Sequence, residues 1–174
     1  MSENNNADFP ERKPTRLKGF DYNKAGAYFI TICSENRRQI FSDIVVGGDV
    51  LDAPYNVELL PYGIVAEKYI NQLNEFYDDI SIESYVIMPN HIHIMLVVFD
   101  DGSSGTSTPT RQHSRLSQFV STLKRFCNKE YGKNIWQRGF HDHVIRDLRD
   151  YKKIARYICE NPIQWQYDCF YSEK

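Results

Sequence analysis

The 174-residue chain lacks any apolar run approaching the roughly 18 residues that a membrane-spanning helix needs. Its first residues, MSENNNADFPERKP, also lack the apolar centre of a secretory signal peptide. Only four cysteines occur and none has the C-x-x-C spacing, which argues against paired zinc-ligand motifs and a redox dithiol. These absences predict a cytoplasmic protein with reduced thiols and no membrane partner.

The chain also has little net charge, and its −2 gives no general attraction to nucleic acid. The charge is unevenly distributed, however. Residues 1–110 carry 8 Lys and Arg against 16 Asp and Glu, whereas residues 111–174 carry 13 against 7, a net of +6. The second part predicts a basic surface, and basic surfaces attract phosphates. The alternative is that the charges mix once the chain folds.

The length and composition are those of one globular domain, with 41% hydrophobic and 14% aromatic residues. Residues 1–15 are polar and rich in Asn, Pro and Glu, so we expect a loose N-terminal arm there and a single domain over residues 16–174. In chain order, the expected elements are a strand (28–33), a hairpin (44–51), a helix (61–77), two strands (80–88 and 91–99), a helix (114–132), a strand (144–145) and a helix (147–160). This irregular order predicts an α+β sandwich with a central antiparallel sheet and helices packed on one face.

Two histidines separated by one residue, His91 and His93, lie in the apolar stretch 91–99. Because side chains alternate along a strand, both imidazoles face one side of the sheet, and Ile92 faces the other. Two imidazoles in adjacent same-face positions can share one metal ion. The alternative is a pair of half-exposed strand histidines without a ligand.

A second pair, His141 and His143, occupies a polar stretch that follows Gly139. His143 directly precedes the apolar residues Val144 and Ile145, so it could face the same cleft as the first pair. We expect His143 to support the site or to form structural hydrogen bonds, and metal ligation is the alternative.

The last expected helix carries a tyrosine on the flank of its apolar stripe. At roughly 100° per residue, Tyr157 shares this flank with Lys153, one turn earlier, and Asn161, one turn later. A phenol beside an amide and an ammonium is a candidate nucleophilic site. The alternative is an ordinary amphipathic edge residue, since the chain holds 12 tyrosines.

Four motifs follow one another along the chain: Met88-Pro-Asn-His-Ile-His93, Trp136-Gln-Arg138, Ile145-Arg-Asp147 and Tyr157-Ile-Cys-Glu-Asn-Pro162. In this order they resemble the single-tyrosine HUH transposases and, more narrowly, the REP-associated tyrosine transposases. The segments 16–22 and 26–33 match one branch of that family, so the resemblance covers residues 12 to 166.

The resemblance implies roles for individual residues. His91 and His93 would hold a divalent ion, Mg²⁺ or Mn²⁺, against the scissile phosphate, with Asn161 as third ligand. Tyr157 would attack the phosphorus, forming a 5′-phosphotyrosine link and freeing a 3′-hydroxyl. We further expect the metal or Lys153 to lower the pKa of this phenol. Since the link keeps the phosphodiester energy, a second 3′-hydroxyl can join new ends without ATP.

The resemblance also implies a ferredoxin-like, RRM-like sandwich forming one catalytic domain, monomeric or homodimeric and associated with the nucleoid. Its substrate would be single-stranded hairpin DNA, such as repetitive extragenic palindromes. Arg138 would contact phosphate or, alternatively, hold the sheet together through a carboxylate. The full set of expected phosphate contacts is Arg12, Lys13, Arg16, Arg115, Lys124, Arg125, Arg138 and Lys153.

A second function remains open, a host-adopted nucleic-acid-binding module that uses the same fold without turnover. The intact set of His91, His93, Tyr157 and Asn161 favours the enzyme, because decay would strike such residues without harming the fold. A two-histidine phosphoesterase is not indicated, since no histidine is followed two positions later by Ser or Thr.

Overall fold

The computed structural model of the protein describes residues 20, 22, 24–46, 55–100 and 114–171. The expected arm over residues 1–15 and the turn at Gly47 and Gly48 lie outside the described residues. In the described part, none of the helices has the length and apolar character needed to cross a membrane.

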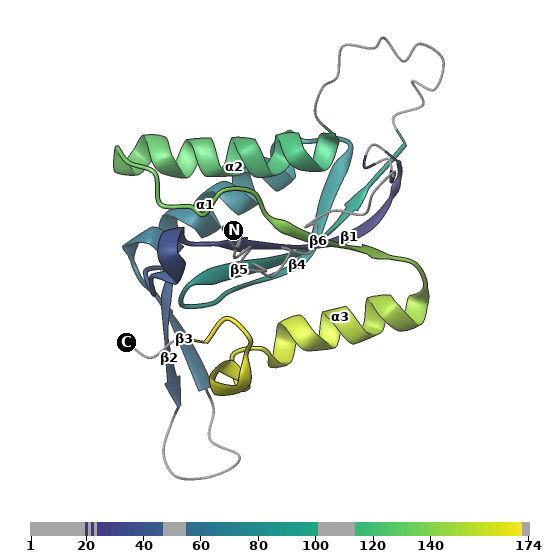
Figure 1. Ribbon diagram of the computed structural model, residues 1–174. Coiled ribbons are helices and arrows are strands. Elements are labelled where there is room, and N and C mark those ends of the chain that lie inside the picture. The colour runs from purple at the N-terminus through teal and green to yellow at the C-terminus, as the bar shows by residue number, and fades with distance from the viewer. Residues whose placement is uncertain (1–19, 21, 23, 47–54, 101–113, 172–174) are drawn as a thin grey trace, which may run out of the picture.

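Four antiparallel strands form the central sheet (Figure 1). Their spatial order is β4 (Ile80–Ile87), β5 (His91–Val98), β1 (Gly26–Cys33) and β6 (His141–Ile145). The chain reverses between β4 and β5 at Pro89 and Asn90, as the sequence predicts. β5 is an inner strand, paired with β4 on one side and with β1 on the other. The α+β class and the antiparallel sheet are thereby confirmed.

Two helices cover one face of this sheet. α1 (Pro61–Phe76) begins at a proline, whose fixed φ suits the first helical turn. α2 (Arg115–Tyr131) begins after Ser114, whose hydroxyl accepts a hydrogen bond from the Ser117 amide, and it ends at Gly132 in a left-handed conformation. Both helices contribute buried side chains to the main core, where they pack on the face of β5 formed by Ile92, Ile94, Leu96 and Val98.

The third helix, α3 (Leu148–Glu160), lies on the opposite face, below the sheet in Figure 1. The expectation of helices on one face therefore holds only for α1 and α2. The physical reason is that β5 is buried on both sides: on the face of His91 and His93, its Met95 packs with Ile154 and Ile158 of α3. The helix that carries Tyr157 thus covers the face to which His91 and His93 point.

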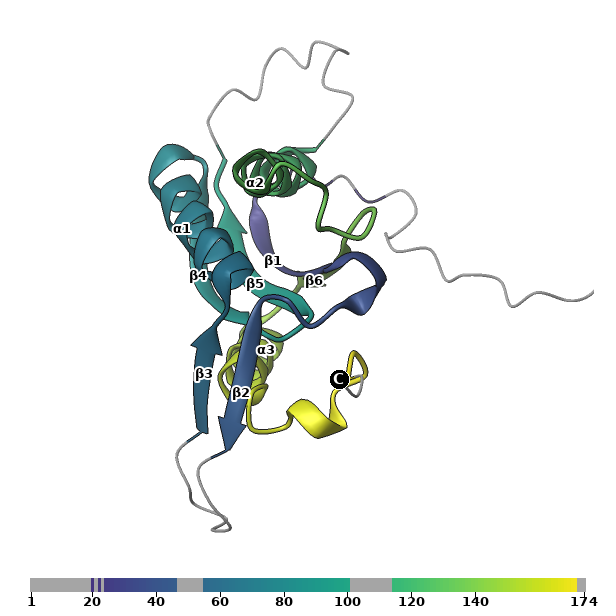
Figure 2. The same cartoon turned by 90° about the vertical axis from the view of Figure 1, so that its left-hand side faces the viewer.

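A separate hairpin extends from the sheet on the side of α3 (Figure 2). Its strands are β2 (Ser42–Val46) and β3 (Tyr55–Leu59), so the second strand begins later than the predicted hairpin over 44–51. The Ser42 hydroxyl donates to the Ile87 carbonyl at 2.8 Å, which ties the hairpin to the end of β4.

The first turn of α1 lies very close to the chain that precedes the hairpin. A Cβ at Gly63 would lie 1.9 Å from the Phe41 carbonyl oxygen, closer than two atoms can approach. We expect Gly63→Ala to lower the free energy of unfolding by about 3 kcal/mol, measured by chemical denaturation. Gly132→Ala is the control. Its φ of 68° is strained for alanine, but among the described residues beyond its chain neighbours no atom lies within 4 Å of the added Cβ, so the free energy of unfolding should fall by only about 1 kcal/mol. Equal losses would contradict the close approach.

Candidate active site

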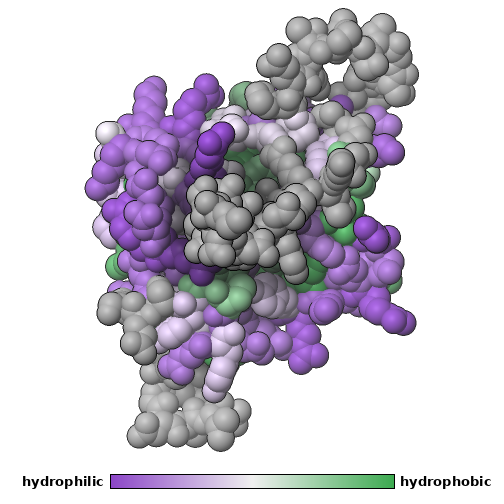
Figure 3. All heavy atoms as spheres, viewed as in Figure 1, coloured by the Kyte–Doolittle hydropathy of each residue, from purple (hydrophilic) through white to green (hydrophobic). Residues whose placement is uncertain are grey.

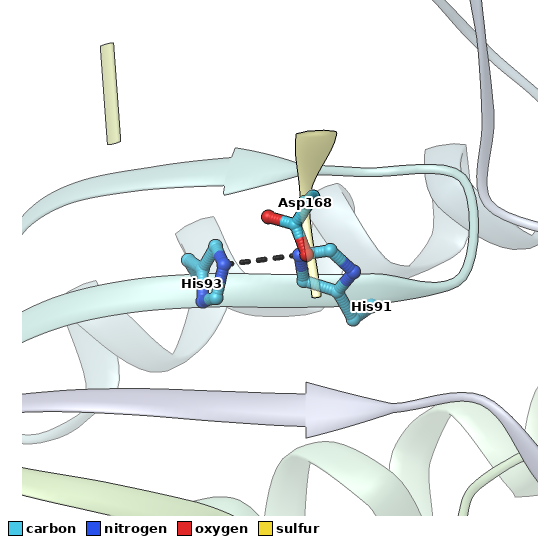
Figure 4. Close-up of side chains that lie close together, drawn as sticks. All are labelled: His91, His93 and Asp168. Carbon is cyan, nitrogen blue, oxygen red and sulfur yellow. Dashed lines mark hydrogen bonds between the residues drawn. The ribbon is translucent and has the colours of Figure 1, made fainter. Parts of the chain in front are cut away.

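β5 turns His91 and His93 toward α3, and both side chains are almost completely buried, 0% and 1% exposed. The alternative of two half-exposed histidines is therefore wrong. Their Nε2 atoms lie 3.0 Å apart, joined by the dashed line in Figure 4. The sequence prediction that both imidazoles share one face is confirmed.

The Nδ1 atoms of both imidazole rings form hydrogen bonds with neighbouring side chains. His93 Nδ1 bonds the Thr31 hydroxyl at 2.8 Å, and His91 Nδ1 bonds Asn90 Oδ1 at 2.9 Å. The Asn90 amide nitrogen donates to the Phe170 carbonyl, so its oxygen faces His91 and His91 Nδ1 is the donor. Such outer partners orient metal-binding imidazoles and set their tautomer.

Burial keeps both imidazoles neutral. It lowers the pKa of His91 to about 3, with the Arg37 charge acting in the same direction. Burial also lowers the pKa of His93 well below its usual value, and the neighbouring His91 adds to this. A neutral imidazole is the form that binds a metal, so the pair is ready for ligation at physiological pH.

Tyr157 brings its hydroxyl to this pair from α3. The phenol oxygen lies 3.3 Å from His93 Nε2 and donates to Asp168 Oδ2 at 3.1 Å, while 37% of the residue remains exposed. Tyr157 is thus more than an amphipathic edge residue. Burial and then Asp168 raise the pKa of this phenol above its usual value, and Asn161 is the neighbour that lowers it. Lys153 is not among the groups that act most strongly on this pKa, and its expected lowering of the pKa stays a prediction.

Asn161, one turn beyond Tyr157, is 2% exposed and has one free oxygen. Its amide nitrogen donates to Asp168 Oδ2 at 2.9 Å. Its Oδ1 is buried and has no hydrogen-bond partner among the described residues. A buried carbonyl oxygen without a partner is unfavourable, and an ion at this position would satisfy it.

Asp168 is the site residue that the sequence analysis missed. It follows the short helix η2 (Trp165–Tyr167) and lies over His91 in Figure 4. One ligand atom from each of His91, His93 and Asp168 lies within 4.8 Å of the others. Asp168 falls outside the four motifs, and the segment after Pro162 has no periodic pattern from which its position could be predicted.

A hollow of about 130 Å³ opens beside the tyrosine. It is lined by Tyr157, Asn161, Gln164, Tyr167, Asp168 and Cys169. Although the two histidines are buried, the Tyr157 side chain can therefore be reached from solvent.

The donor atoms suit a small divalent ion. Mg²⁺ takes octahedral ligands at about 2.1 Å, which puts neighbouring ligand atoms about 3 Å apart. The two Nε2 atoms have this separation. The Asn161 oxygen, without a hydrogen-bond partner among the described residues, would supply the hard oxygen ligand that Mg²⁺ and Mn²⁺ prefer. The residues present therefore fit the expected ion.

The second histidine pair lies on the same face of the sheet but outside this group. His143 bonds Asp150 of α3 at 2.7 Å; His143 is exposed and Asp150 is half-buried. This contact joins β6 to the start of α3, the helix that carries Tyr157 and is called the tyrosine helix below. It corresponds to the structural hydrogen bond that the sequence analysis expected of His143.

The expected phosphate contacts are spread over both faces of the sheet. Arg12, Lys13 and Arg16 lie outside the described residues. On α2, Arg115 pairs with Asp79 at 3.4 Å, Lys124 donates to the carbonyls of Gln137 and Gly139, and Arg125 is exposed. Arg138 is exposed in the connection between α2 and β6, and Lys153 is exposed on α3, one turn before Tyr157.

α3 itself carries more exposed cations than the sequence analysis named. Arg149, Lys152, Lys153 and Arg156 are all exposed, and they lie on the side of the helix away from Ile154 and Ile158. Hydrophilic side chains cover the lower right of the molecule, where α3 lies (Figure 3). The tyrosine helix therefore presents a positive stripe to solvent.

The chain is similar in sequence and in fold to known transposases. No protein-family model matches the chain. An uncharacterized protein of Haemophilus influenzae is 28% identical, covering 98% of this chain and 99% of its own. The REP-associated tyrosine transposase of Escherichia coli is 26% identical, covering 82% of this chain and 70% of its own. A solved structure of a REP-associated tyrosine transposase bound to a REP hairpin covers 90% of this chain and 74% of its own, with a TM-score of 0.56 and 21% identity.

These matches confirm the resemblance to the REP-associated tyrosine transposases that the four motifs indicate. The structural match shows that the fold is shared.

Proposed function

We propose that this relative of the REP-associated tyrosine transposases is a metal-dependent endonuclease and strand transferase acting on single-stranded DNA. One observation carries the proposal: the Tyr157 hydroxyl, from a helix, lies 3.3 Å from the Nε2 of His93, from a strand 64 residues away. A hydroxyl group next to a neutral imidazole pair suits metal-assisted phosphoryl transfer, because the pair can hold an ion beside the attacking oxygen.

In the proposed reaction, Tyr157 Oη attacks the scissile phosphorus in line with the departing 3′-oxygen. The Oη–P bond forms and the P–O3′ bond breaks, giving a 5′-phosphotyrosine and a 3′-hydroxyl. The phenol loses one proton and the 3′-oxygen gains one, so the step is balanced without a co-substrate. Attack by a second 3′-hydroxyl on the phosphotyrosine reverses the step and joins new ends.

The ion would be held by His91, His93 and Asn161. When bound, a divalent ion polarises the phosphoryl oxygen and stabilises the charge that develops on it. Burial and Asp168 raise the pKa of the Tyr157 phenol, so a nearby cation would favour the phenolate, which is the attacking form.

The substrate we propose is hairpin DNA with a single-stranded flank. Support comes from the structural relative, which is bound to a REP hairpin. The positive stripe of α3 leads along the helix to Tyr157 and would hold the backbone of the strand to be cut.

The test is incubation with single-stranded hairpin DNA from the flanks of the gene, in the presence of Mn²⁺, followed by denaturing electrophoresis. The expected product is a slowly migrating covalent protein–DNA adduct that requires the metal. Tight binding without an adduct, over a panel of flanking hairpins, would instead support a non-catalytic nucleic-acid-binding module.

The α3 stripe gives a separate prediction for binding. Replacing Arg149, Lys152 and Lys153 by alanine should reduce the slope of log affinity against log salt by about 2, since each phosphate contact on a single strand contributes about 0.7. Fluorescence anisotropy with labelled hairpin DNA measures this slope. Alanines at Arg125 and Lys129, exposed on α2 across the sheet, remove two charges and test the other face; the slope should change less than in the α3 variant. A larger change in that control would assign the DNA to the α2 face.

A further inference from the structure

The three ligands expected from the sequence, two imidazoles and one amide, are all neutral. A divalent ion held by them alone would bring two positive charges into a buried site without compensation. Burying an unpaired charge is strongly unfavourable, and Mg²⁺ and Mn²⁺ bind carboxylates most readily. In the DNA-free protein, where no phosphate is present, a carboxylate is therefore needed.

Asp168 is the carboxylate that lies in the right place. Together with His91 and His93 it forms the one group of three His, Cys, Asp or Glu side chains close enough to share an ion within the part of the chain that is described. Its carboxylate is oriented by three donors, Tyr157 Oη and Asn161 Nδ2 on Oδ2 and the Phe170 amide on Oδ1.

The segment that carries Asp168 is docked on the histidine strand. The Phe170 ring centre lies 4.7 Å from that of His91, and the buried Trp165 ring lies 5.9 Å from it. The Asn90 amide nitrogen donates to the Phe170 carbonyl, and Arg37 donates to the Cys169 carbonyl. Residues on both sides of Asp168 are thus held against the site, so the carboxylate is preorganised there.

We propose that Asp168 is a direct, anionic ligand of the divalent ion, and that it allows the protein to load the ion before DNA binds. This deepens the proposed function and rests on its metal site. His91, His93 and Asn161 supply neutral donors, whereas Asp168 supplies the charge. The phosphate of the DNA then joins a site that already contains its ion.

The experiment is a titration of the full-length, DNA-free protein with Mn²⁺, followed by electron paramagnetic resonance of the free ion and by calorimetry. Asp168→Asn keeps the size and one hydrogen-bond acceptor but removes the charge, and it should weaken Mn²⁺ binding at least about 10-fold. Asp168→Glu should bind more tightly than Asp168→Asn. Asp150→Asn, the same exchange in the first turn of α3, should leave Mn²⁺ binding unchanged, because Asp150 bonds His143 and lies outside the group of ligand atoms.

Unfolding of the metal-free proteins separates ligation from a structural role. If Asp168 only docks its segment, Asp168→Asn will shift the unfolding curve and leave Mn²⁺ affinity unchanged, which overturns the proposal. Absence of Mn²⁺ binding by the DNA-free wild type also overturns it. Metal binding that depends on Asp168, without any DNA adduct, would uphold this inference and defeat the proposed nuclease. A DNA adduct formed by the wild type, together with undiminished Mn²⁺ affinity in Asp168→Asn, would support the proposed nuclease and overturn this inference.

Discussion

Tyr157→Phe should abolish the covalent protein–DNA adduct and leave hairpin affinity unchanged. The substitution removes only the oxygen that attacks phosphorus, and its ring still fits beside Phe29 and His93. Loss of a covalent nucleophile lowers the rate by at least about 10³-fold, so no adduct should be visible. Denaturing electrophoresis measures the adduct, and anisotropy measures binding.

The matched control is Tyr151→Phe, on the same helix. The Tyr151 hydroxyl donates to Glu83 at 3.3 Å and so points away from the imidazole pair. Its loss should leave adduct formation intact. Should the adduct survive in Tyr157→Phe and disappear in Tyr151→Phe, the nucleophile would be Tyr151.

His91→Gln should reduce metal-dependent cleavage by about 10²–10³-fold. His91 is fully buried, so glutamine is preferred to alanine because it fills most of the space and limits the loss of stability. The reduction follows from the loss of a ligand whose ion stabilises the transition-state charge. The measurement is the cleavage rate over a range of Mn²⁺ concentrations, with an unfolding curve to confirm that the variant is folded.

His141→Ala provides the comparison for this loss. His141 lies on the same face of the sheet, paired with Thr31, but it is exposed and outside the group of ligand atoms. Its removal should change the cleavage rate by less than about 3-fold. A loss equal to that of His91→Gln would extend the site to β6.

The sequence predicted those parts of the protein whose pattern is local. The alternation of His91, Ile92 and His93 predicted the common face of the two imidazoles, because strand geometry alone decides it. The caps Ser114 and Asp147 correctly marked the starts of α2 and α3, since a side chain that accepts a backbone hydrogen bond acts within one turn.

The parts that failed depend on contacts between distant segments. The face covered by α3 could not be predicted, because its apolar stripe fits either side of a sheet whose inner strand is buried on both. Asp168 reaches the site through Trp165 and Phe170, which pack against His91, and nothing in the local sequence signals that contact. The Lys124 ammonium donates to the connection before β6, a contact between distant segments that the sequence did not indicate, and its expected phosphate contact stays a prediction.

The packing of α3 on the sheet divides the molecule into regions of different local stability. β5 is hydrogen-bonded on both sides and contributes to the main core, so its amides should exchange with solvent only on global unfolding. α3 rests on a small cluster of Met95, Ile145, Ile154 and Ile158, and such a helix can detach at a lower free energy. A DNA end joined to Tyr157, as proposed, would then move away from His91 and His93 together with its helix and with Asn161 at the end of that helix, while β5 stays folded.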